Sequence, residues 1–347
     1  MGSTAPCSPP GLLSTIGTRQ INRDQGAPLH RAPLARTHAL PQPEEPGLRL
    51  HLRERRPAGA VVSTVLLVHG ATFASTLWDV AVPDASFLDA LAGAGCAAYA
   101  LDIRGYGRSI PSSPPPQDRP YARATAAIRD IDLAVDFIRA REGRERIALL
   151  GGSWGTITCG LYAAGAGGAK LERLVLYAPL YSGHSAEWLA MIADPADPGR
   201  PNPALGACRQ VTETVARGRW DAEIPYEDKG LWREERVFQA ILADSLAAAG
   251  GGEAFPAPNG CLLDLFEVFS GRPLYEAGAI ALPTLLVRGA GDPTSSRADA
   301  LGLFDRLGSR VKRYLEIGHG AHFICAERNA WQVFDEVASF LCHPLRP

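Results

Sequence analysis

The segment Ile147–Gly160, IALLGGSWGTITCG, decides the fold class of this chain. Its apolar run, Ile147–Leu150, is typical of a buried β-strand, and the run of small residues after Ser153 is typical of a helix. The pattern G-x-S-x-G places Ser153 at the turn between the two. A serine at this position is either a catalytic nucleophile or the polar residue of a tight turn, and the rest of the chain must decide.

Apolar, strand-like runs alternate with helix-like segments on both sides of this turn. The clearest helix is expected over 121–143, where isoleucine and valine recur at helical spacing and Gly143 ends the pattern. The strand-like runs are 62–70, 96–105, 146–152, 173–181, 284–292 and 311–317. This alternation predicts crossover connections, and therefore an α/β fold with a mostly parallel sheet and helices on both faces.

Two regions lie outside this alternation. Residues 1–45 are rich in Pro, Ser, Thr and Arg and lack the apolar stretch of a secretory signal. We expect them to be a flexible N-terminal extension, with an organelle transit peptide as the alternative. Residues 183–281 contain short helical stretches but no strand-like run of the earlier kind. We therefore expect a core formed by 46–182 and 282–347, with a mainly helical cap inserted at 183–281.

Composition narrows the class of partner. The formal net charge is −2 and no apolar run is long enough to span a membrane, so neither nucleic acid nor a membrane is expected as a partner. The seven cysteines form no C-x-x-C motif and do not cluster with histidines at metal-ligand spacing. We expect reduced thiols in a cytoplasmic protein, no metal ion and a small-molecule substrate, with homo-oligomer formation left open.

Chemically active residues follow several of the predicted strands. Ser153 follows one strand, Asp292 a later one, and His319 and His322 the last. In an open parallel sheet, reacting groups lie beyond the carboxyl ends of the strands. The positions of Ser153, Asp292 and the two histidines after strands therefore predict that a serine, an acid and a histidine gather at one edge of the sheet. Along the chain they occur in the order Ser, Asp, His.

Five local patterns make the chain resemble the α/β-hydrolase family. The patterns are HGATF (69–73), DIRGYGRS (102–109), GGSWG (151–155), GAGD (289–292) and GHGAHF (318–323). The resemblance extends from about residue 46 to residue 343. It implies an α/β-hydrolase fold in which Ser153 occupies a sharp strand-to-helix turn, the nucleophile elbow. The small residues Gly151 and Gly155 would let the strand and the helix approach closely there.

The resemblance also implies a catalytic triad. Ser153 would attack the substrate, His322 would accept the serine proton, and Asp292 would hold the second imidazole nitrogen. His322 is preferred to His319 because the family places its histidine before an aromatic or aliphatic residue, which is Phe323 here. Such a mechanism requires no cofactor, and we expect none.

Further residues are assigned to the oxyanion hole and the substrate pocket by the same resemblance. The backbone N–H groups of Trp154 and Ala71, with Thr72 as the second choice for the latter, would bind the negative charge on the substrate oxygen. Thr72, Tyr181 and Trp188 are expected to line the pocket. Structural roles are expected for His69, Asp102 and Arg104.

A serine at the elbow favours acyl transfer, so we expect a serine hydrolase that cleaves a carboxylic ester, lactone or thioester through an acyl-enzyme. The elbow GGSWGT (151–156) is similar to that of proline iminopeptidases, which implies an aminopeptidase or amidase as the first alternative. Acids such as Glu223 in the cap would then hold a substrate amine, although basic residues alternate with them as on a solvated surface. Carbon–carbon bond hydrolysis and a non-catalytic ligand receptor are the remaining alternatives.

Overall fold

The structure, a computed structural model, describes residues 34–344 and is built on an eight-stranded sheet. The strand order is β1-β2-β4-β3-β5-β6-β11-β12. The bounds of the strands are β1 Leu34–Pro41, β2 Arg49–Arg56, β3 Ser63–Val68, β4 Cys96–Leu101, β5 Ile147–Gly152, β6 Leu171–Tyr177, β11 Thr284–Gly289 and β12 Lys312–Ile317. All strands from β4 to β12 in this order run parallel, whereas β2 is antiparallel to both of its neighbours. The predicted fold class is therefore confirmed.

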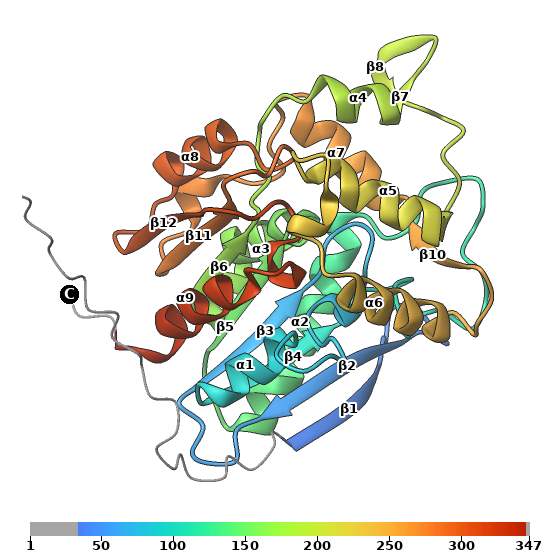
Figure 1. Ribbon diagram of the computed structural model, residues 1–347. Coiled ribbons are helices and arrows are strands. Elements are labelled where there is room, and N and C mark those ends of the chain that lie inside the picture. The colour runs from blue at the N-terminus through green and yellow to red at the C-terminus, as the bar shows by residue number, and fades with distance from the viewer. Residues whose placement is uncertain (1–33, 345–347) are drawn as a thin grey trace, which may run out of the picture. The chain divides into compact units, whose positions relative to one another are not determined.

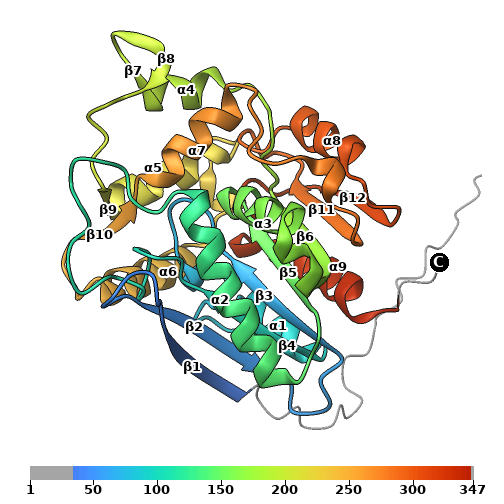
Figure 2. The same ribbon diagram turned by 180° about the vertical axis from the view of Figure 1, so that it is seen from behind.

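Helices cover both faces of the sheet. Helices α1 (Phe87–Gly93) and α9 (Ala330–Cys342) pack on the face that is nearer the viewer in Figure 1. Helices α2 (Ala124–Glu142) and α3 (Trp154–Ala164) pack on the opposite face, which Figure 2 shows, and α8 (Arg297–Arg306) lies beside β12. None of the helices within residues 34–344 combines the length and the hydropathy needed to cross a lipid bilayer.

The hydrophobic pattern accounts for the central elements. Strands β3 and β5 are buried along their entire lengths, as expected for strands that are covered on both faces. Helix α2 buries one apolar stripe that includes Ile131, Val135 and Ile138. It ends at Gly143, whose φ of 61° lies in the left-handed region that favours glycine at this position.

The predicted boundary at residue 46 is wrong for the residues just before it. Strand β1 pairs with β2 along its whole length, from Leu34 opposite Arg56 to Pro41 opposite Arg49. Leu40 is the one buried residue of β1, because β1 is the edge strand and its other side chains face solvent to different degrees. An edge strand of this kind carries little hydrophobic signal. The part of the predicted extension before residue 34 lies outside the described residues.

The segment between β6 and β11 contains both helices and short strands. Its helices are α4 Ala186–Ile192, α5 Glu213–Glu223, α6 Glu235–Ala248 and α7 Gly260–Phe269. The sequence predicted no strand of the earlier, apolar kind here. Two short strand pairs are present: β7 (Ala193–Asp194) pairs with β8 (Asp197–Pro201), and β9 (Cys208–Thr212) pairs with β10 (Ala254–Pro258). We call residues 183–281 the inserted segment, since the chain leaves the sheet after β6 and returns to it at β11.

Candidate active site

Ser153 lies at the sharp turn between β5 and α3. Its φ of 54° and ψ of −120° are strained for a residue with a side chain, so the surrounding contacts must hold it there. The Ser153 N–H donates to the carbonyl of Tyr177 at 2.9 Å, and its own carbonyl accepts from the Thr156 N–H at 2.8 Å and the Thr156 hydroxyl at 2.6 Å. The sheet and the first turn of α3 thus hold this backbone conformation.

Two glycines leave room for this turn. A Cβ atom added to Gly155 would lie 2.5 Å from the carbonyl oxygen of Val68, and one added to Gly151 would lie 2.2 Å from the carbonyl oxygen of Gly155. Both distances are too short for any side chain, and the obstructing atoms belong to the backbone. The elbow therefore requires glycine on both sides of Ser153 for steric reasons.

A continuous chain of hydrogen bonds links Ser153, His322 and Asp292. His322 Nε2 lies 2.8 Å from Ser153 Oγ, and His322 Nδ1 lies 2.8 Å from Asp292 Oδ2. Asp292 follows β11, and its other oxygen accepts the N–H groups of Thr294 at 2.9 Å and Ser295 at 2.8 Å. Because Asp292 is an acceptor, the Nδ1 proton faces the carboxylate, which leaves Nε2 free to accept the serine proton.

His319, the other histidine of the loop after β12, does not reach this site. His319 is exposed, has a φ of 55°, and contributes its carbonyl oxygen to a hydrogen bond from the Asn329 side chain. Glu327 holds the loop on the other side of His322, since its buried carboxylate accepts the Ala321 N–H at 2.8 Å. Burial raises the pKa of Glu327 to about 7. The geometry thus places His322, and not His319, against Ser153.

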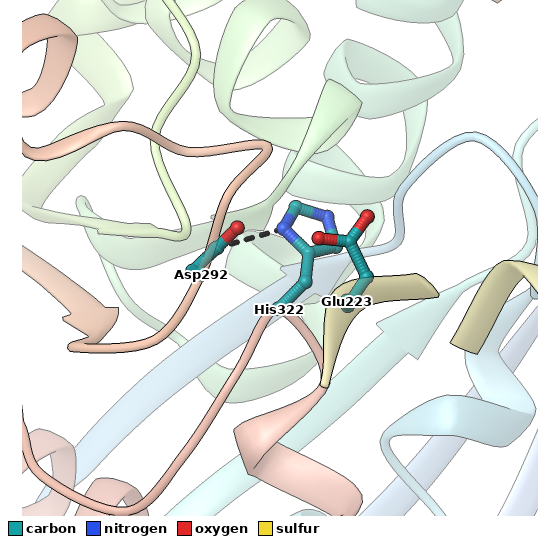
Figure 3. A group of neighbouring side chains, drawn as sticks. All are labelled: Glu223, Asp292 and His322. Atoms are coloured by element: carbon teal, nitrogen blue, oxygen red, sulfur yellow. Dashed lines mark hydrogen bonds and ion pairs between the residues drawn. The ribbon is translucent and has the colours of Figure 1, made fainter. Parts of the chain in front are cut away.

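A second carboxylate, which the sequence pattern did not reveal, lies beside the imidazole. Glu223 ends α5, is 1% exposed, and has a carboxylate oxygen within 4.8 Å of ligand atoms of both His322 and Asp292. Figure 3 shows its carboxylate next to the imidazole ring, on a different side from Asp292. A metal ion could in principle bind three such groups, but both imidazole nitrogens already take part in the hydrogen bonds to Ser153 and Asp292.

Glu223 belongs to a polar network that joins the inserted segment to Asp292. It forms an ion pair with Arg219, one helical turn earlier, and accepts the Thr294 hydroxyl at 2.7 Å. Thr294 Oγ also accepts from Arg219 and from the Trp188 indole, each at 3.1 Å. Because the Thr294 N–H bonds to Asp292, the network connects both carboxylates that surround the imidazole.

These charges determine the protonation of His322. Complete burial of the ring disfavours the imidazolium form, but the carboxylates of Asp292 and Glu223 outweigh burial and raise the pKa of His322 above its usual value. The Arg219 guanidinium acts in the opposite direction. An imidazole in this setting can accept a proton, because the resulting positive charge is compensated by nearby negative charge.

The loop after β3 lies beside Ser153, and both line the same cavity. Within residues 34–344, neither the Ala71 N–H nor the Trp154 N–H donates a hydrogen bond to another protein atom, and the same is true of the Thr72 N–H. The Trp154 ring is fully buried, and its indole N–H donates to Asp264 of α7 at 3.0 Å. The assignment of these N–H groups to an oxyanion hole stays a prediction.

The residues expected to have structural roles lie in buried networks. Buried His69 donates from Nδ1 to the Gly70 carbonyl at 2.8 Å and accepts the Ile103 N–H at Nε2, and burial lowers its pKa, which favours the neutral ring. Arg104 pairs with Asp130 of α2. Asp102 is 1% exposed and accepts backbone N–H groups from two loops. These contacts stabilise the loops that surround the site.

A small cavity of about 30 Å³ opens beside Ser153 and His322. Its wall is mostly apolar and includes Phe73, Leu77, Trp78, Tyr177, Leu180, Leu265 and Phe323. Thr72 and Trp188 line it, whereas Tyr181 does not, contrary to the prediction. The Tyr181 ring packs in the core against Tyr275, with its hydroxyl directed to the Tyr275 carbonyl. Arg219 and Thr294 supply polar atoms to the wall.

The comparisons with known proteins agree with this fold. The family model described as "Serine aminopeptidase, S33" matches residues 59–329. Three similar solved structures are each 18% identical to this chain, and the alignment covers 98% of each of those chains. A thermophilic esterase from Thermogutta terrifontis has a TM-score of 0.60 over 88% of this chain, and epoxide hydrolase A from Mycobacterium thermoresistibile has a TM-score of 0.59 over 89%. The enol-lactonase from Burkholderia xenovorans LB400 has a TM-score of 0.58 over 86% of this chain.

At this level of identity the solved structures support the fold, and their different activities do not select a reaction. No curated protein sequence matches the chain. The family match covers most of the chain, including the segments that carry Ser153, Asp292 and His322. The chain belongs to the serine aminopeptidase S33 family of α/β-hydrolases.

Proposed function

We propose that the protein is a serine hydrolase that cleaves a carboxylic ester of a small molecule through an acyl-enzyme. The observation that carries this proposal is the pair of 2.8 Å hydrogen bonds that link His322 to Ser153 and to Asp292, beside an apolar cavity. A serine hydroxyl is a poor nucleophile at neutral pH, and this arrangement supplies the base that it needs.

The positions of these groups support the following reaction. Ser153 Oγ attacks the ester carbonyl while His322 Nε2 takes its proton. The N–H group of Trp154 and that of Ala71, with Thr72 as the alternative loop donor, bind the oxyanion. The imidazolium then protonates the leaving alcohol, which departs and leaves an acyl group on Ser153. Water attacks this acyl group while His322 takes its proton, and the imidazolium then returns the proton to Ser153 Oγ as the carboxylic acid is released. Asp292 holds the imidazole and stabilises its charged form in both steps.

A panel of substrates tests this proposal. The cavity of about 30 Å³ favours a short acyl chain, so p-nitrophenyl acetate should be hydrolysed faster than the octanoate. The panel also includes lactones, a prolyl naphthylamide and a fluorophosphonate probe. A burst of nitrophenol equal to the enzyme concentration is the expected sign of an acyl-enzyme. If the folded protein gives neither turnover nor a fluorophosphonate adduct, the proposal is wrong and a ligand receptor is favoured.

An aminopeptidase is the second candidate, and Glu223 is the observation that favours it. One oxygen of this buried carboxylate has no hydrogen-bond partner among residues 34–344, and a substrate ammonium group could provide one. The ion pair with Arg219 already compensates the charge of Glu223, which favours the ester. Faster turnover of the prolyl naphthylamide than of any ester in the panel would reverse this order.

The pH dependence of kcat/KM should have an acid limb above pH 6.5. The base must be neutral, and its raised pKa means that protonation removes activity at a higher pH than an unperturbed histidine would. Glu223→Gln should move this limb to lower pH, because the variant lacks a carboxylate that stabilises the imidazolium. The matched control is Glu213→Gln at the exposed start of α5. An unchanged limb in Glu223→Gln would contradict this account of the pKa of His322.

A further inference from the structure

Arg209 connects the inserted segment to the loop that carries the proposed oxyanion hole. It lies on β9, and its guanidinium donates to the Ala71 carbonyl at 2.5 Å. It also donates to the Pro258 carbonyl at 2.9 Å and to the Asn259 side chain at 3.2 Å. Among residues 34–344, no carboxylate forms an ion pair with it, so carbonyl and amide oxygens are its main acceptors.

The contact with Ala71 fixes the direction of a peptide group. In a planar trans peptide the N–H points away from the C=O, so a donor that holds the Ala71 carbonyl also directs the Thr72 N–H. The Tyr106 hydroxyl donates to the same carbonyl oxygen at 3.1 Å. His69 holds the Gly70 carbonyl in the same way at 2.8 Å, which directs the Ala71 N–H. Hydrogen bonds to the Gly70 and Ala71 carbonyls thus fix the directions of the Ala71 and Thr72 N–H groups, the two candidate oxyanion donors of this loop.

The guanidinium also changes the strength of the Thr72 donor. A peptide whose carbonyl accepts a hydrogen bond from a cation is polarised, and its N–H becomes a stronger donor. Arg209 is not part of the cavity wall, which includes Ala71 and Thr72. Its influence on a bound substrate must therefore pass through the loop.

We propose that Arg209 is a positioning residue for catalysis, which holds and polarises the 70–72 loop so that it binds the transition state. This inference rests on the proposed function. An oxyanion forms only during the reaction, so Arg209 should contribute to kcat much more than to substrate binding.

The test compares the kinetics of Arg209→Gln with those of the wild-type protein. We expect kcat for the preferred p-nitrophenyl ester to fall by about 10- to 100-fold, less than the loss of a direct oxyanion donor, while KM changes by less than about 3-fold. A trifluoromethyl ketone, which forms an oxyanion with the serine, should bind more weakly by a similar factor. Arg209→Lys, which keeps a charged donor, should recover part of the lost kcat.

The matched control is Arg200→Gln, on β8 of the same segment, where the side chain is exposed and pairs with Asp194. Active sites are counted with the fluorophosphonate probe, so that a smaller folded fraction is not mistaken for a lower kcat. Two results would overturn the inference while the proposed function stands. One is an unchanged kcat per active site in Arg209→Gln, and the other is an equal fall of kcat in Arg209→Gln and in the control Arg200→Gln. If Arg209→Gln does not fold, the kcat and KM of Arg209→Lys decide in the same way. Absence of ester turnover in the wild-type protein would refute the proposed function, and this inference with it.

Discussion

Ser153→Ala is expected to lower kcat/KM for the preferred ester by at least about 10⁴-fold. The variant keeps the cavity and the oxyanion donors but has no atom that can form the acyl-enzyme. The strained backbone at this position is held by contacts of main-chain atoms, so the fold should persist. Steady-state hydrolysis, the nitrophenol burst and fluorophosphonate labelling should all be lost together.

The control for this variant is Ser113→Ala, an exposed serine in the loop after β4. It should retain wild-type kinetics. If Ser153→Ala kept more than about a tenth of the activity, or if the fluorophosphonate still labelled the protein, the nucleophile would be another residue.

His322→Ala is expected to have an effect of similar size, about 10³- to 10⁴-fold on kcat/KM or larger. Without the imidazole, Ser153 loses the acceptor that lies 2.8 Å from its hydroxyl, and Asp292 loses the group that it orients. The effect should appear mainly in kcat, because the apolar wall of the cavity is unchanged.

The neighbouring histidine provides the comparison. His319→Ala removes an exposed side chain that has no contact with Ser153, so kcat/KM should stay within about 3-fold of the wild-type value. Both variants are measured with the same ester, and circular dichroism checks their folding. A large loss in His319→Ala together with near-normal activity in His322→Ala would show that the loop rearranges in solution.

The elements that surround the site were predictable because the chemistry coincides with a strong hydrophobic pattern. Buried parallel strands such as β3 and β5 are recognisable as apolar runs, and the residues directly after them meet at one edge of the sheet. Ser153 and Asp292 occupy such positions. Both residues were therefore predictable from the sequence alone, without knowledge of the distances between their side chains.

Other features depend on contacts that no local pattern encodes. Strand β1 is an edge strand whose residues are mostly exposed, and its hydrogen bonds to β2 hold it in place. Glu223 follows Arg219 at the spacing of a solvated helix face, yet it is buried beside His322. Tyr181 is aromatic and close to the site in sequence, but its ring packs in the core, and the N–H groups of Tyr181 and Ser182 donate to the Asp299 carboxylate.

The place where the inserted segment joins the sheet has an evolutionary consequence. Strands β6 and β11, which precede and follow it, are adjacent and parallel. Within the inserted segment, His184 and Ser270 form an antiparallel bridge, so the part of the chain between these two residues leaves and returns at one place. An insertion of another length can be grafted there without breaking a strand pair of the main sheet. Trp188, Arg219 and Leu265 of this segment face the cavity, whereas Ser153, Asp292 and His322 lie outside it in the sequence. Replacement of the inserted segment during evolution can therefore change the substrate preference, while the residues proposed for the reaction stay the same.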